Sequence, residues 1–159
     1  MFSPPNILKI DDFDFEREGT APKPKYMVVI LKTSTDTIIA PLTTSQDYIP
    51  DNHKGKRCVE DVPSRLHCYC IPTKLKVGKK GFMFPLDTYI QVQGNLMKRS
   101  ISYLKTKYQA KDKVELLDEL TTSEYKKLLQ CIAKSQFVPR GIREAIAPVV
   151  KKLKRATSR

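Results

Sequence analysis

The sequence predicts an α+β fold in which a small β-barrel is covered by C-terminal helices. Two observations lead to this prediction. Short apolar segments separated by turn residues fill the first two thirds of the chain, and after them the apolar period lengthens to that of helices. The length of 159 residues suits a single domain. We expect the barrel over about residues 7–120 and the helices over residues 121–155.

The clearest strands form a hairpin in the first third of the chain. Residues 26–31 are continuously apolar, as a buried strand would be, and residues 37–42 are its predicted partner. Turn-forming residues at 33–36 connect the two. A short strand is also expected at residues 7–10, and the polar residues 43–57 are predicted to form a loop.

Three more strands are expected farther along the chain. Residues 66–72 and 82–92 are candidates, and a basic turn at residues 74–81 separates them. Part of the second candidate alternates apolar and polar side chains, as a half-exposed strand does. Residues 114–117 would supply the last short strand.

Helices are expected in the last third. Apolar residues at 96–104 suit a short helix, and Thr121 with Glu124 forms a capping box that begins a longer one. Two sets of apolar side chains then repeat at helical spacing: Tyr125, Leu128, Leu129, Ile132 and Ala133, followed by Ile142, Ile146, Val149, Val150 and Leu153. Pro148 is expected to kink the second helix.

The net charge of +12 predicts a polyanionic partner, and we expect that partner to be RNA. The charge is unevenly distributed. Residues 1–22 are acidic, whereas residues 54–80 and the tail at 151–159 are strongly basic. The alternative to a polyanionic partner is a basic surface that contacts only solvent.

The sequence has no apolar run approaching the roughly 20 residues that span a bilayer. Its first residues lack the pattern of a signal peptide. We therefore expect a cytoplasmic protein with no membrane partner. In that compartment Cys58, Cys68, Cys70 and Cys131 would be free thiols.

Neither a metal nor a cofactor is expected. Cysteines and histidines at 53–70 are the right types for zinc, but their spacing matches no paired Cys-x-x-Cys pattern. In an alternating strand, Cys68 and Cys70 share one face, and two small core positions explain them without a metal. The sequence also lacks a Gly-rich phosphate loop and the common hydrolase motifs.

One constellation could act on a phosphate. Lys23-Pro24-Lys25 comes before the buried strand, and Pro41-Leu42-Thr43-Thr44-Ser45-Gln46 ends its hairpin partner. A hairpin brings these ends together, so that lysine ammonium groups and hydroxyl groups would converge. The alternative is structural, with residues 43–45 capping a strand and the lysines decorating its edge.

The order of these pieces resembles the PemK/MazF-type toxins of bacterial toxin–antitoxin systems. The matching stretches are Glu18-Gly19, Lys23-Pro24, 27–30, 41–46, 87–92 and 121–132. The similarity covers about residues 16–133, and its most specific part is the hairpin at 23–46. The tail from Phe137 onward has no counterpart in the family.

This resemblance implies an SH3-like barrel that forms a homodimer and acts as a growth inhibitor. The implied activity is a metal-independent endoribonuclease on single-stranded RNA, in which the ribose 2′-oxygen attacks the adjacent phosphate. The implied protein partner is a cognate antitoxin whose acidic tail occupies the basic groove.

The family's phosphate-holding threonine corresponds to Thr43, whereas a lysine stands where its arginine is expected. Lys25 preserves the distance to the buried strand and is favoured, while Lys23 preserves the basic residue–proline pair. Lysine keeps the charge but loses the planar fork of arginine. Other cations could compensate. The side chains expected to bind RNA are Arg17, Thr44, Ser45, Gln46, Lys54, Lys56, Arg57 and Arg65.

Two alternatives to an enzyme remain open. The missing arginine and the basic tail favour a non-catalytic module on the same barrel that binds RNA, DNA or an acidic protein. The second alternative is a fold relative that targets a protein, as the gyrase-poisoning toxins on this barrel do.

Overall fold

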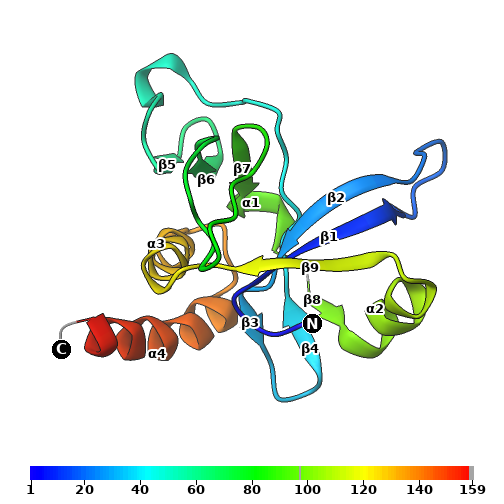
Figure 1. Cartoon of the computed structure of the whole chain (residues 1–159). Helices are drawn as coiled ribbons and strands as arrows, with labels where there is room; N and C mark the ends of the chain where they lie inside the picture. The colour runs from blue at the N-terminus through cyan, green and yellow to red at the C-terminus, as the bar shows by residue number, and fades with distance from the viewer. Residues whose placement is uncertain (97, 158–159) are drawn as a thin grey trace.

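The computed structural model describes residues 1–96 and 98–157, which form three antiparallel sheets of three strands each (Figure 1). The sheet orders are β2-β1-β9, β3-β4-β8 and β5-β6-β7. The strands are β1 (Asn6–Phe13), β2 (Lys23–Val28), β3 (Leu31–Lys32), β4 (Thr37–Ile39), β5 (Cys58–Asp61), β6 (Leu66–Ile71), β7 (Thr88–Gln91), β8 (Lys98–Ser100) and β9 (Val114–Glu119). The helices are α1 (Val92–Asn95), α2 (Ile101–Lys107), α3 (Thr122–Ala133) and α4 (Arg140–Thr157), with 3-10 turns η1 (Asp51–His53) and η2 (Gln109–Lys111).

The α+β class is confirmed, but the sheets do not close into a barrel within the described residues. Isolated bridges join neighbouring sheets, including the pair Thr44 and Tyr89. The bridge between Thr44 and Tyr89 does not extend into a longer ladder of strand hydrogen bonds, because the loop begins directly after Thr44. None of the helices in residues 1–96 and 98–157 is long and apolar enough to cross a membrane.

The predicted hairpin forms. The amide of Ile30 donates to the carbonyl of Ile39 at 2.9 Å, and the amide of Val28 donates to the carbonyl of Pro41 at 3.2 Å. Residues 27–30 are fully buried, which explains the uninterrupted apolar run. The pairing continues to Thr43, whose amide donates to Tyr26. The end of the second strand therefore lies beside the start of the first.

The centre of the β2-β1-β9 sheet is buried on both faces. Ile7 and Val28 face one core cluster with side chains of α3 and α4, while Leu8 and Met27 face another that includes residues of α2. Figure 1 shows the same division, with α3 and α4 at the left and α2 at the right. A third cluster lies under the loop at 43–57 and contains Ile49, Val59, Leu66, Cys68 and Cys70.

Three strand predictions change. The predicted strand at 82–92 is reduced to β7, because Phe82 and Phe84 leave the sheet and pack around Tyr26, with the Phe84 ring centroid 5.3 Å from that of Tyr26. β5 follows directly after the predicted loop at 43–57, in a stretch for which no element was predicted, while β9 extends the predicted last strand and pairs with β1. Contacts with distant segments decide the first and the last of these changes, whereas β5 pairs with the neighbouring strand β6.

The expectation of four free thiols is wrong for two of them. Cys58 and Cys131 form a disulfide between β5 and α3. They lie 73 residues apart in the chain, so no local pattern could pair them. Cys68 and Cys70 are free and buried on one face of β6, as expected, while Tyr69 joins the core on the other face.

α3 begins as predicted, with the Thr121 hydroxyl accepting from the Glu124 amide at 3.2 Å. The capping box is only half formed, because the Glu124 carboxylate accepts instead from Arg57 and from the Tyr69 hydroxyl. α4 buries Ile142 and Ile146 as predicted and contains Pro148 within its length.

Candidate functional site

The structure brings Lys25 and Thr43 together. The Lys25 Nζ donates to the carbonyl oxygen of Thr43 at 3.4 Å, and the two residues share a pocket of about 150 Å³. The pocket is lined by Pro24, Lys25, Tyr26, Thr43, Thr44, Ser45, Pro85, Leu86 and Thr88. Its position follows from the hairpin, which sets the start of β2 against the end of the paired segment. None of these lining residues carries a carboxylate or an imidazole that could hold a metal.

Lys25 is the more enclosed of the two candidate lysines. It is half-buried, and burial lowers the pKa of its ammonium, with a further lowering from the charge of Lys23. Lys23 is exposed and lines no part of the pocket. Both ammonium groups lie over the ring of Phe15, at 5.5 Å for Lys23 and 5.8 Å for Lys25. The geometry therefore places Lys25, and not Lys23, beside Thr43 in this pocket.

The hydroxyl-rich turn is held in place by backbone pairing. Thr44 exchanges two hydrogen bonds with Tyr89, at 2.9 and 2.8 Å. The Thr44 hydroxyl accepts from the amide of Gln46, whose side chain accepts from the Tyr48 hydroxyl. Thr43 is only 5% exposed, whereas Ser45 and Gln46 are open to solvent. The turn thus presents a short polar rim around a mostly buried threonine.

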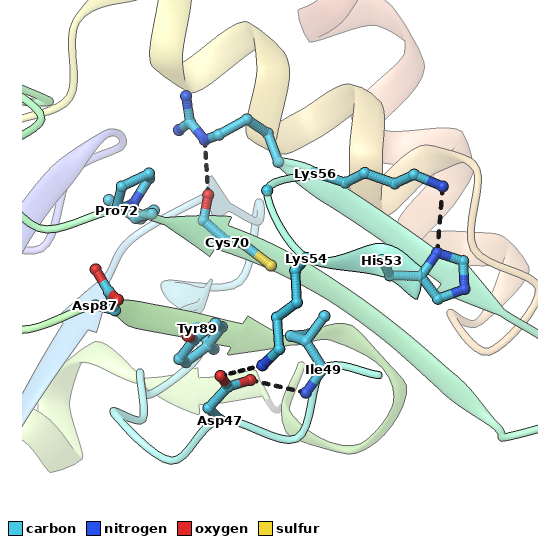
Figure 2. A pocket seen from close by; sticks show the side chains of 12 residues that line it. Asp47, Ile49, His53, Lys54, Lys56, Cys70, Pro72, Asp87 and Tyr89 are labelled. Carbon is cyan, nitrogen blue, oxygen red and sulfur yellow. Dashed lines mark hydrogen bonds and ion pairs between the residues drawn. The ribbon is translucent and has the colours of Figure 1, made fainter. Parts of the chain in front are cut away.

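A second pocket, of about 220 Å³, opens along the loop that follows the turn (Figure 2). Lys54 points across it and forms an ion pair with Asp47, while Lys56 Nζ lies 3.3 Å from His53 Nδ1. The His53 Nε2 lies 3.2 Å from the Asp61 carboxylate. The predicted cations Lys54 and Lys56 therefore line a pocket, each with a partner inside the protein.

Arg57 also lines the second pocket, but the donors described for it are used within the protein. Its Nε donates to the carbonyl of Cys70 at 2.7 Å, its Nη2 donates to the Tyr69 hydroxyl at 3.1 Å, and it pairs with Glu124. We therefore do not assign Arg57 to RNA. Arg65 is exposed at the turn between β5 and β6 and lines neither of these two pockets.

A third pocket, of about 340 Å³, lies behind the ring of Phe15 and contains a cation that the sequence did not single out. The Nε of Arg99 donates to the carbonyl of Ala40 at 3.2 Å, and its guanidinium lies 5.5 Å from the ring centroid of Phe13. Burial lowers the pKa of Arg99. The exposed Arg17 lines the same pocket. Arg99 reaches this position because β8 pairs with β4, and no local sequence pattern predicts that pairing.

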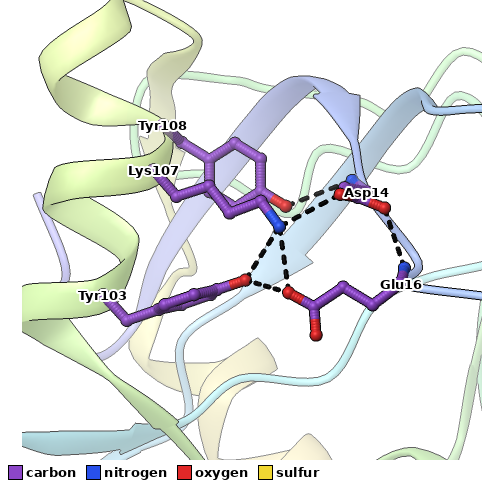
Figure 3. A network of polar contacts seen from close by, with 5 residues as sticks. All are labelled: Asp14, Glu16, Tyr103, Lys107 and Tyr108. Atoms are coloured by element: carbon purple, nitrogen blue, oxygen red, sulfur yellow. Dashed lines mark hydrogen bonds and ion pairs between the residues drawn. The ribbon is translucent and has the colours of Figure 1, made fainter.

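The acidic N-terminal segment is fastened to α2 by a polar network (Figure 3). The Lys107 ammonium donates to Asp14 at 3.1 Å and to Glu16 at 2.9 Å, and the Tyr103 hydroxyl also donates to Glu16. The amide of Asp14 donates to the Tyr108 hydroxyl at 3.1 Å. Phe15 lies in the chain between the two acids of this network, so the network holds in place the ring that lies under Lys23 and Lys25.

Removing the central cation of this network should loosen the segment. In Lys107→Met we expect faster amide hydrogen exchange across residues 14–17, whereas Lys105→Met, which changes an exposed lysine of the same helix, should leave exchange unchanged.

Hydrogen bonding lowers the pKa of Asp14, mainly from the Glu16 amide and then Lys107, and that of Glu16, mainly from Tyr103 and then Lys107. The network is therefore complete above the ordinary values of 3.8 and 4.5 and is lost as pH falls through the lowered values. Unchanged amide exchange at residues 14–17 in Lys107→Met would contradict the role of Lys107 in holding this segment.

Comparisons of the chain with family models, with curated proteins and with solved structures find no match.

Proposed function

We propose that this chain binds single-stranded RNA at the Lys25 pocket and cleaves it there as a metal-independent endoribonuclease of the toxin type, on a fold related to the SH3-like barrel. The observation that carries the proposal is the contact between Lys25 and Thr43. These are the two residues that the resemblance assigns to the phosphate, and the hairpin places a lysine ammonium and the hydroxyl-bearing residues 43–45 around one small pocket.

The surroundings of the pocket suit a single strand. Aromatic rings lie among cations, with Phe15 under two lysines and Phe13 under Arg99. Tyr48 and Leu86 are 59% and 61% exposed beside the turn. Unpaired bases stack on accessible aromatic rings such as that of Tyr48, while cations neutralise the backbone. The net charge of +12 would speed the encounter with RNA.

The proposed reaction needs no cofactor. The 2′-oxygen attacks the adjacent phosphorus and loses its proton to solvent, and the bond from phosphorus to the 5′-oxygen breaks. The Lys25 ammonium stabilises the charged transition state, gives a proton to the departing 5′-oxygen and regains one from solvent. The products are a 2′,3′-cyclic phosphate and a 5′-hydroxyl. The lowered pKa of Lys25 makes its ammonium a better proton donor than an ordinary lysine.

Arg99 is our candidate for the charge that the missing family arginine would have supplied. Its guanidinium lies in the pocket lined by Leu42 and Phe15, and Lys25 lies over that same ring. In Arg99→Gln we expect RNA affinity to fall about tenfold, the loss of one charge-assisted hydrogen bond. Fluorescence anisotropy with a labelled single strand measures it, with Arg140→Gln on α4 as the matched control. Equal affinities for the two variants would remove Arg99 from the site.

The proposal extends to the partners that the resemblance implies. An acidic antitoxin segment would compete with RNA for the same lysines and aromatic rings, and a homodimer would present two such pockets. Competition by an acidic peptide in the anisotropy assay and the mass in sedimentation equilibrium would test these two points.

Binding without cleavage is the second candidate function. Two observations favour it: Thr43 is 5% exposed, and a lysine cannot grip two phosphate oxygens with a planar fork. In this case the same pocket would hold RNA, and binding would weaken steeply with salt, but no products would form.

One experiment separates the two functions. The chain is incubated in chelator with a labelled single-stranded RNA and with the same strand carrying 2′-deoxyribose at the cut positions. Cleavage of the first strand alone, with cyclic phosphate ends, supports the nuclease. Salt-sensitive binding of both strands without products supports the binding module. Neither binding nor products with any of several unrelated sequences would overturn the proposal.

A further inference from the structure

Three side chains that prefer zinc converge at the junction of β5, β6 and α3. The Nε2 of His67 lies 3.6 Å from the Sγ of Cys58 and 3.5 Å from the Sγ of Cys131. The three candidate ligand atoms all lie within 4.8 Å of one another. Each comes from a different element, so the fold rather than a sequence motif assembles the group. This cluster is separate from the Lys25 pocket, and a metal site here does not depend on the proposed function.

The spacing matches one face of a zinc tetrahedron. With zinc–nitrogen bonds of about 2.0 Å and zinc–sulfur bonds of about 2.3 Å, the nitrogen and each sulfur of a tetrahedral site lie about 3.5 Å apart. Both nitrogen–sulfur separations in the structure have this length. Only the two sulfurs, which are joined in the disulfide, would have to move apart, to about 3.8 Å.

His67 is oriented as a metal ligand. It is fully buried, its Nε2 faces both sulfurs, and its Nδ1 faces the Glu60 carboxylate at 3.7 Å. That nitrogen has no hydrogen-bond partner among the described residues. Zinc-bound histidines commonly direct their second nitrogen at a carboxylate in this way. Burial lowers the pKa of His67, which favours the neutral imidazole that binds metals.

We propose that Cys58 and Cys131, when reduced, bind Zn²⁺ together with the Nε2 of His67. Two thiolates balance the charge of the ion, so that the buried site is neutral overall. Cys58 is partly exposed, and we expect a water molecule to supply the fourth ligand. The metal and the disulfide use the same sulfurs and exclude each other. Either one ties β5 to α3, beside the Arg57–Glu124 pair, so this junction is cross-linked in both redox states.

Cobalt reports on the site directly. The full chain is reduced with a phosphine, which takes up the oxygen of water as the disulfide becomes two thiols, and is then titrated anaerobically with Co²⁺. We expect one equivalent to produce thiolate-to-cobalt charge transfer and the visible bands of tetrahedral cobalt, and Zn²⁺ to bleach both. Cys58→Ser should lose at least tenfold in affinity, whereas Cys70→Ser, a buried free thiol outside the cluster, should bind as the parent does.

The parent chain also supplies a control with no substitution. When its disulfide is reformed with diamide, the same folded protein should bind no cobalt. The proposal is overturned if the reduced parent gives no charge-transfer band, or if the oxidised parent or Cys58→Ser binds as tightly as the reduced parent. Circular dichroism of each sample confirms that the fold is retained.

Discussion

Replacing Lys25 with alanine is expected to lower the rate of RNA cleavage by about 100- to 1,000-fold, the loss of one donor that acts in the transition state. The fall should lie in kcat more than in KM, because the surrounding cations and rings still bind the strand. Thr43→Ala should lower the rate through the same pocket. Single-turnover kinetics with a labelled single strand measure the effect.

Two matched variants sharpen this result. Lys32→Ala removes an exposed lysine at the other end of the same hairpin and should leave cleavage unchanged. Lys25→Arg supplies the planar fork that the family uses and should cleave at least as fast as the parent. If Lys25→Ala and Thr43→Ala both cut at the parental rate, the site is elsewhere even though the activity is real.

Replacing Arg57 with methionine should lower the free energy of unfolding by about 2–3 kcal/mol, somewhat less than the loss of one partner from a fully buried pair, because Arg57 itself is partly exposed. The Glu124 side chain is 7% exposed and would lose the guanidinium while keeping the hydrogen bond from the Tyr69 hydroxyl. Urea unfolding measures the loss. RNA affinity of the folded variant should not change, because the donors of Arg57 are used within the protein.

A double-mutant cycle tests the origin of that loss. Adding Glu124→Gln removes the stranded charge and should recover part of the stability, so the two changes should not be additive. Arg65→Met, at an exposed turn, should change stability by less than about 0.5 kcal/mol. If Arg57→Met lowered RNA affinity and left the free energy of unfolding unchanged, Arg57 would be assigned to the RNA-binding surface.

The features that could be predicted from the sequence are those that local burial and capping decide. The run at 27–30 is buried on both faces and therefore had to be apolar throughout, which marked the hairpin. The Thr121 hydroxyl caps α3 because the first amides of a helix need an acceptor. Alternation placed Cys68 and Cys70 on one face of β6. The meeting of Lys25 with Thr43 follows from the hairpin alone.

The packing of distant segments against one another produced the remaining features. It set β9 against β1, brought Arg99 beside Phe13, and joined Cys58 to Cys131 across 73 residues. It also turned Glu124 from its own helix end toward Arg57. Period and composition report which face of an element is buried, but not which element covers it. The hairpin could therefore be predicted from the sequence. The position of Arg99 and the cluster of Cys58, His67 and Cys131 could not.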